Sequence, residues 1–257
     1  MINALHGPIS CVTLDWGDTL VANYGMPYGF VHDRALNALA SALTAAGGTV
    51  DAQWIEASAN ELHELWVGSA QPEINPENKE FDYDGLLGKW VAATGLERSQ
   101  PAVAEALQVY GATVTDTICP FAEAGEALAE LHGMGLRIGI LSHVPWPGWA
   151  CRAWYERKGW APYIDFYSLS CDVGYIKPHP AHYQNTLDQA NCPAAHIAHV
   201  GDHPQRDVVG AREYGMQTIL KVTQGIYADE DLIGCDPHAA IAHVRELPAL
   251  IRPHLAT

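Results

Sequence analysis

Five short apolar runs recur along this chain and limit what it can fold into. They lie at about 9–15, 136–141, 164–169, 196–200 and 216–221. After the first interval, each gap between runs holds a single helical pattern, at about 148–158, 180–190 and 204–214. Strands that alternate with helices are typical of βαβ units on a parallel sheet. The sequence therefore predicts an α/β fold, with a further helix at about 123–133 and a weaker sixth strand near 238–242, followed by a closing helix from Arg245 through Pro248.

The interval from about 21 to 115 breaks this alternation. Its helical patterns lie at about 29–46, 51–68, 82–94 and 101–112. Gly47-Gly48 separates the first two, and the prolines and asparagines of Gln71–Asn78 predict a loop. A mostly helical region is thus inserted directly after the first strand.

Composition narrows the class of protein. A chain of 257 residues that is 48% hydrophobic has room for one large domain, or for a core domain with a smaller companion. The sequence contains no run of eighteen apolar residues, so no membrane span is predicted, and the N-terminus lacks the pattern of a secretion signal. Six widely spaced cysteines without a CxxC pair predict reduced thiols, and hence a cytoplasmic protein. The sequence carries no mark of an oligomeric state.

The formal charge of −16 argues against a nucleic-acid partner and against an anionic membrane surface. An anionic substrate must therefore meet a local cation. The thirteen histidines are scattered without a metal-binding spacing such as HExxH, so most are expected at the surface.

Polar residues recur where predicted strands end, at the edge where open α/β sheets place their ligands. Four such segments are Val12–Leu20, Ile138–Ser142, Lys177–Pro180 and Gly201–Asp207. Taken singly, each has an ordinary interpretation: Asp15 or Asp202 could cap a turn or helix, and Lys177 could lie in a surface turn. In this order, however, they resemble the four motifs of the haloacid dehalogenase (HAD) superfamily of hydrolases.

The resemblance implies a Rossmann-like, three-layer core with a parallel sheet, formed by residues 1–20 and 116–257. It also implies that residues 21–115 are a helical C1-type cap over the active site. A single βαβ unit separates the second and third motifs, which leaves no room for a second cap.

The same resemblance assigns roles to residues. Asp15 is the nucleophile, and Thr19, Ser142 and Lys177 complete the catalytic set. Thr19 and Ser142 would donate hydrogen bonds to phosphoryl oxygens, and Lys177 would supply fixed positive charge. Ser142, His143 and Lys177 would contact a small phosphorylated substrate. The implied intermediate is an aspartyl phosphate, later cleaved by water.

A carboxylate that attacks an anionic phosphoryl group needs a cation between the two. The resemblance implies Mg²⁺, held by Asp15, the backbone carbonyl of Gly17 and Asp202, with Asp207 supporting the metal site.

Gly17 departs from the family pattern, because most HAD phosphatases carry a second aspartate there. That acid protonates the departing alkoxide and then activates water, which is worth roughly 10²–10⁴ in rate. Glycine cannot do either. His143 is the nearest alternative donor, and His203 is the second.

Gly17 also keeps other readings open. A phosphonoacetaldehyde hydrolase shares the Asp15-Trp16 pair but needs an early cap lysine, and the cap offers only Lys79 and Lys89. A 2-haloacid dehalogenase is metal-free and lacks a motif like Gly201-Asp202. A catalytically weakened binding or regulatory protein would also fit the missing acid. A receiver domain fails on length and on the cap-sized insertion.

Aromatic residues cluster after Ser142. They are Trp146, Trp149, Trp154 and Trp160, and they form either a core patch or, with Trp16, Tyr24 and Tyr28, an apolar wall near the cap. Such a wall would suit a hydrophobic leaving group.

Overall fold

The predicted α/β fold is built around one six-stranded sheet with the order β5-β4-β1-β6-β7-β8. The computed structural model describes residues 4–22, 28–69, 71–223, 227 and 234–255. Neighbouring strands of this sheet all run parallel. The strands are β1 (Cys11–Leu14), β4 (Arg137–Ser142), β5 (Phe166–Leu169), β6 (Ile197–Gly201), β7 (Gln217–Lys221) and β8 (Ala239–Ile241). The five main strand predictions and the weaker sixth are confirmed.

Strand β1 lies in the middle of the sheet, where the strand order reverses. The chain passes from β1 to β4 and β5 on one side, and then returns to β6, β7 and β8 on the other. Leu14 pairs with both Ile140 and Val200, and every residue of β1 is buried. Burial on both faces explains why Cys11, Val12 and Leu14 of this strand are apolar. Open α/β sheets bind ligands at the carboxyl edge of such a reversal, and Asp15 follows β1 at that edge.

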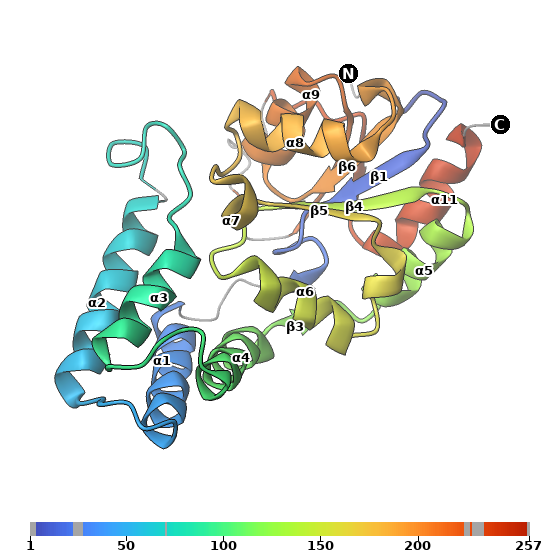
Figure 1. Cartoon of the computed structure of the whole chain (residues 1–257). Coiled ribbons are helices and arrows are strands. Elements are labelled where there is room, and N and C mark those ends of the chain that lie inside the picture. Colours follow the sequence, from blue (N-terminus) through green and yellow to red (C-terminus); the bar gives the residue numbers. More distant parts are fainter. Residues whose placement is uncertain (1–3, 23–27, 70, 224–226, 228–233, 256–257) are drawn as a thin grey trace.

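Helices cover both faces of the sheet and complete the three layers (Figure 1). One face carries α8 (Pro180–Ala190) and α9 (Ala211–Glu213), and the other carries α5 (Ala124–Gly133), α6 (Gly148–Arg157) and α11 (Leu247–Ile251). Shorter elements are α7 (Ser170–Val173), η1 (Ala161–Tyr163), η2 (Ala194–His196), η4 (Val244–Glu246) and η5 (Arg252–His254). In the part of the chain that the structure describes, no helix is both long and apolar enough to span a membrane.

The helix predicted at 204–214 is wound unevenly. Its first seven residues, η3 (Pro204–Gly210), form a π-helix that precedes α9. Asp207 lies in this segment and packs against Gly201, where an added Cβ would come within 2.2 Å of the Asp207 carboxyl carbon. π-turns are frequent at functional sites. In this chain the π-helical segment contains Asp207, whose side chain packs against the last residue of β6.

The predicted helical insertion forms a second lobe beside the sheet (Figure 1). We call α1 (Tyr28–Ala45), α2 (Ala52–Ser69), α3 (Tyr83–Ala93) and α4 (Pro101–Asp116) the helical lobe, and the six-stranded sheet with its covering helices the sheet lobe. The chain passes between the lobes through β2 (Val21–Ala22) and β3 (Cys119–Pro120), which pair antiparallel. This two-stranded ribbon has no counterpart in the sequence predictions.

The lobes touch where α4 packs on α6. Gly111 of α4 makes this close approach possible, because an added Cβ would lie 2.3 Å from the Trp149 ring. The Trp149 indole N–H also donates to an Asp84 carboxylate oxygen on α3, at 3.2 Å.

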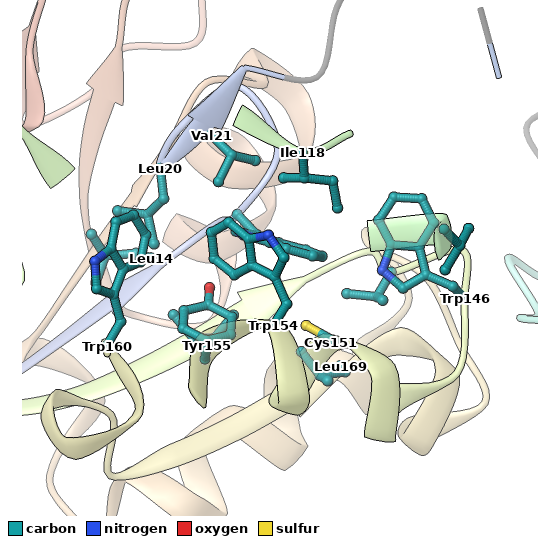
Figure 2. Packing of buried hydrophobic residues seen from close by; sticks show 14 of the residues in the cluster. Leu14, Leu20, Val21, Ile118, Trp146, Cys151, Trp154, Tyr155, Trp160 and Leu169 are labelled. Carbon is teal, nitrogen blue, oxygen red and sulfur yellow. The ribbon is translucent and has the colours of Figure 1, made fainter. Parts of the chain in front are cut away.

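The tryptophan cluster after Ser142 is core rather than a wall. Trp146, Trp154 and Trp160 are all buried, and Figure 2 shows Trp154 and Trp160 near Tyr155, with Trp146 farther along the same cluster. Trp149 is only partly buried. The core interpretation therefore holds for three of these four tryptophans. Tyr24 and the side chain of Tyr28 lie outside the described residues.

Trp16 belongs to the same core. It is buried, and its ring centroid lies 5.0 Å from that of Trp154 and 5.8 Å from that of Trp146. Edge-on aromatic contacts of this kind stabilise beyond their buried area. Because Trp16 directly follows Asp15, this packing anchors the candidate nucleophile to the core.

Candidate active site

All four predicted motifs meet at the buried lysine of the third, Lys177. Lys177 Nζ lies 2.9 Å from Asp15 Oδ1 and 2.5 Å from Asp207 Oδ1, and it donates to the Leu141 carbonyl at 3.0 Å. Lys177 is only 2% exposed. Burial alone would lower the pKa of Lys177, but the two carboxylates outweigh it and raise that pKa, so the lysine stays cationic. The surface-turn interpretation of Lys177 is excluded.

A third carboxylate adds negative charge that Lys177 does not offset. Oxygens of Asp15, Asp202 and Asp207 lie within 4.8 Å of one another, and all three residues are buried. Burial, followed by the charges of Asp207 and Asp15, raises the pKa of Asp202 to about 8. Burial also raises the pKa of Asp15, despite the opposing charge of Lys177. Such shifts are expected where like charges share a dry site without enough cation.

Both oxygens of the Asp207 carboxylate have hydrogen-bond partners. Oδ1 contacts Lys177 and lies 3.2 Å from His199 Nε2, while Oδ2 accepts the His203 backbone N–H at 2.9 Å. Burial would raise the pKa of Asp207, but Lys177 and His199 lower it strongly. This arrangement suits a residue that supports a metal site from behind.

A pocket of about 140 Å³ opens above these carboxylates. It is lined by Asp15, Gly17, Asp18, His143, Lys177, Asp202, His203, Arg206, Asp207 and Tyr227. Tyr227 donates its hydroxyl proton to Asp202 Oδ2 at 3.0 Å. The pocket is smaller than those that hold drug-sized ligands, so it favours a small substrate.

Two predicted residues lie beside this pocket without lining it. Ser142 is buried at the end of β4, and its hydroxyl hydrogen-bonds the Asp15 carboxylate and lowers the Asp15 pKa. Thr19 is fully buried, and its Oγ1 has no hydrogen-bond partner among the described residues. An unpaired buried hydroxyl is costly, so Thr19 holds a donor available for a ligand. Asp18 completes the turn with a left-handed φ of 54°.

The structure shows different environments for His143 and His203, the two histidines considered as proton donors. His203, not Asp202, caps the helix, because its Nδ1 accepts the backbone N–H groups of Gln205 and Arg206. Burial lowers the pKa of His203 to about 4, which leaves it neutral at pH 7. Neither feature suits an acid. His143 lines the pocket and lies close to Glu80, with Nε2 3.2 Å from Oε2.

His199 was missed by the sequence interpretation. It is fully buried in β6, where its ring bridges Asp207 and the Thr13 hydroxyl, with Nδ1 3.0 Å from Oγ1. His199 is an exception to the expectation that most histidines lie at the surface, as are His32 and His182, which are also buried. A polar residue inside an apolar strand was the available signal, since buried polar groups require partners.

The two lysines of the helical lobe lie away from the pocket. Lys79 pairs with Glu77 and Lys89 pairs with Glu61, and both lysine side chains are mostly exposed. Neither lines the pocket, so neither is placed to form a Schiff base with a substrate there.

The chain matches known proteins in sequence and in fold. The profile of haloacid dehalogenase-like hydrolases matches residues 9–215. A phosphoglycolate phosphatase of Yersinia pseudotuberculosis is 26% identical over 208 residues, which cover 79% of this chain and 83% of the relative. A glyceraldehyde 3-phosphate phosphatase of Methanocaldococcus jannaschii is 30% identical over 112 residues, but this match spans only 47% of that relative and 43% of this chain.

Solved structures share the fold across nearly the whole chain. A 2-haloacid dehalogenase of Pseudomonas syringae covers 95% of this chain with a TM-score of 0.63 and 24% identity, and 99% of that protein is covered. A HAD phosphatase of Thermococcus onnurineus covers 97% with a TM-score of 0.61 and 17% identity, and is itself fully covered. A Rossmann-like hydrolase core with this site defines the class. The chain belongs to the haloacid dehalogenase-like hydrolase family, and it is an enzyme of that family.

Proposed function

We propose that this enzyme is a Mg²⁺-dependent phosphatase of small phosphorylated metabolites that works through an aspartyl phosphate on Asp15. The observation that carries the proposal is the cluster of three buried carboxylates against one lysine. Such a cluster has uncompensated negative charge, and a divalent cation bound by oxygen ligands would balance it.

The relatives support phosphate monoesters as substrates. Two curated relatives are phosphatases of phosphoglycolate and of glyceraldehyde 3-phosphate, both small phosphorylated compounds. The dehalogenases among the solved structures are under 25% identical, so they speak for the fold alone. The small pocket agrees with a substrate of a few carbon atoms.

The residues have the chemistry that the reaction needs. A carboxylate oxygen of Asp15 attacks phosphorus, the bond to the leaving alcohol breaks, and the phosphoryl group is held on Asp15. Water then attacks phosphorus and releases phosphate and the free carboxylate. Lys177, 2.9 Å from Asp15, offsets the charge of the incoming group, and the hydroxyls of Ser142 and Thr19 donate to phosphoryl oxygens.

Asp15, the Gly17 carbonyl and Asp202 would hold the metal, with Asp207 behind them. When bound, Mg²⁺ supplies the positive charge that keeps both acids ionised and stabilises charge on the transferring group. The close approach of Asp15 and Asp202, both buried, fits this assignment, because a divalent cation would offset the negative charge that Lys177 leaves.

Residues 1–20 and 116–257 would form the catalytic core and residues 21–115 a C1-type cap. The β2–β3 ribbon supports this division. Its two strands are the segments through which the chain enters and leaves the helical lobe, they pair with each other, and each lies within a few residues of a proposed boundary.

Steady-state hydrolysis of 4-nitrophenyl phosphate with Mg²⁺, with EDTA, and with Mg²⁺ restored tests the proposal. We expect turnover with Mg²⁺, a loss of at least about 100-fold in EDTA, and recovery on adding Mg²⁺ back. Asp202→Asn should weaken metal activation, whereas Asp188→Asn on the exposed side of α8 should not.

Other outcomes would identify the alternatives. Full activity in EDTA, or chloride release from 2-chloropropionate, would instead indicate dehalogenase chemistry. Binding of phosphorylated compounds without any turnover would indicate a weakened binding protein. Phosphoglycolate and glyceraldehyde 3-phosphate are the first natural substrates to compare.

A further inference from the structure

The loop between α2 and α3 joins two helices of the helical lobe, and it contacts the sheet lobe beside α7 (Figure 1). Glu80 N donates to the Gly174 carbonyl at 2.9 Å, and Ile176 N donates to the Asn78 carbonyl at 2.8 Å. These bonds form a short antiparallel bridge with Lys79 opposite Tyr175. The bridge ends one residue before Lys177. The helical lobe is thus attached to a segment that carries a catalytic residue.

Glu80 points from this bridge into the interior. Its side chain is only 2% exposed, and its Oε2 lies 2.5 Å from the Ser170 hydroxyl and 3.2 Å from His143 Nε2. The Ser170 hydroxyl oxygen in turn accepts the Val144 backbone N–H at 2.9 Å. A carboxylate removed from water is stable only with partners. Glu80 therefore faces the backbone and side chain of the segment directly after Ser142.

A second residue of the helical lobe holds the other side of His143. The Trp66 ring, near the end of α2, stacks on the imidazole with centroids 5.9 Å apart and planes 25° apart. His143 also lines the pocket that contains Asp15. Its ring therefore lies between a carboxylate and an indole at the pocket wall, with Nε2 close to Glu80 but without an aligned hydrogen bond to it.

A carboxylate beside one imidazole nitrogen is a common way to position a histidine for general acid–base catalysis. This is the arrangement needed by a proton donor that must also take a proton back. The sheet lobe lacks such a group at Gly17, where the family's usual acid is replaced by hydrogen.

We propose that His143 is the acid–base group of the phosphatase reaction and that Glu80, from the helical lobe, is its positioning residue. This inference rests on the proposed function. In the first step the imidazolium gives its proton to the departing alkoxide, which leaves as an alcohol. In the second step neutral His143 takes a proton from the attacking water, and the remaining hydroxide becomes part of the released phosphate.

The test compares a poor with a good leaving group. We would measure kcat and KM for ethyl phosphate and for 4-nitrophenyl phosphate with Mg²⁺, in the full chain and in Glu80→Gln, His143→Gln and the double variant. Only the alkoxide needs a proton to leave, so kcat for ethyl phosphate should fall at least about tenfold more than kcat for the aryl ester. Because the two residues act as a unit, the double variant should be no worse than His143→Gln.

Glu77→Gln, in the same loop but exposed and paired with Lys79, is the matched control and should leave the ratio of the two rates unchanged. Ser170→Ala removes a Glu80 contact without touching the histidine. If Glu80→Gln lowers kcat equally for both esters, and Ser170→Ala does the same, Glu80 only holds the two lobes together and the inference is overturned. Additive losses in the double variant would do the same. If the unaltered protein hydrolyses neither ester, the proposed function itself fails.

Discussion

The carboxyl edge of the sheet and the loop between α2 and α3 reach the same pocket by different routes. At the edge, Asp15 and Asp202 each follow a strand directly, and Ser142 ends one. Their places are fixed once three neighbouring parallel strands pair. Glu80 lies in a loop without regular structure, and its place depends on how the helical lobe docks on the sheet lobe.

This difference separates two parts of the proposed chemistry. The nucleophile and the charges around it depend on the sheet, which is continuous and buried. The proposed supply of a proton depends on a contact between lobes, and such contacts are easier to shift than a sheet. Changes at the edge should therefore stop the reaction, whereas changes in the loop should alter which esters are cleaved.

The largest effect is expected at the edge itself. Asp15→Asn removes the attacking oxygen, so turnover of 4-nitrophenyl phosphate should fall by at least about 10³-fold. Circular dichroism and the unfolding midpoint should show an intact fold, because the substitution removes one negative charge from a cluster of three carboxylates. Asp188→Asn serves as the control. Retention of more than a few per cent of activity would end the covalent mechanism.

Lys177 should be the next most sensitive position. Lys177→Met leaves Asp15 and Asp207 without their shared cation, and breaking a buried ion pair costs about 3–5 kcal/mol. Lys79→Met breaks an exposed pair, which is worth about 1 kcal/mol or less. Urea unfolding at pH 7 in EDTA compares the two. Equal losses of unfolding free energy would mean that the buried ion pairs of Lys177 stabilise the fold no more than the exposed pair of Lys79.

Gly17→Asp should sharpen the contrast by moving the acid onto the edge. In the Glu80→Gln variant, where the histidine is no longer positioned, adding Gly17→Asp should raise turnover of ethyl phosphate at least about tenfold, with a ceiling of roughly 10²–10⁴, and that of the aryl ester much less. In the Gly17→Asp background, Glu80→Gln should no longer change the ratio between the esters. An unchanged ratio on adding Gly17→Asp to Glu80→Gln would show that an aspartate at this place cannot replace the histidine.

The last prediction concerns the acid stability of the sheet lobe. Burial lowers the pKa of His182 from 6.5 to about 3, and its Nε2 lies 3.0 Å from the Ser168 carbonyl oxygen. The unfolded chain then binds the proton more readily, so stability falls as pH drops from about 6.5 towards 3, by up to about 1.4 kcal/mol per pH unit.

His182→Gln should flatten that pH dependence, measured by urea unfolding in EDTA from pH 7 to pH 4. His132→Gln, on the exposed surface of α5, should not. Parallel curves for His182→Gln and the unaltered protein would show that this histidine contributes nothing to acid sensitivity.

Sequence alone predicted the parts of the fold that follow from periodicity. The apolar runs located all strands of the main sheet, and the helices of the helical lobe begin and end within a few residues of their predicted bounds. Strand-end polar residues predicted where Asp15, Ser142 and Asp202 lie, because parallel strands bring their carboxyl ends to one edge. Lys177 and Asp207 follow no strand directly, yet Lys177 contacts both Asp15 and Asp207.

What periodicity could not give were contacts between segments without regular structure. Glu80 looks like any polar residue of a loop, and only the docking of that loop shows it facing His143. Tyr227 likewise reaches Asp202 from a segment with no strand or helix signal. The π-helix at Pro204–Gly210 also escaped, because its polar pattern does not differ from that of an α-helix start.

The β2–β3 ribbon makes the helical lobe replaceable. Val21 and Pro120 face each other across an antiparallel pair, so the insertion enters and leaves within about 5 Å. Closing that gap with a short turn costs little chain entropy, and β1 and β4 need not move. One catalytic sheet can therefore be joined to different lobes over time, with recognition of the substrate exchanged as a unit while the attacking chemistry is inherited unchanged.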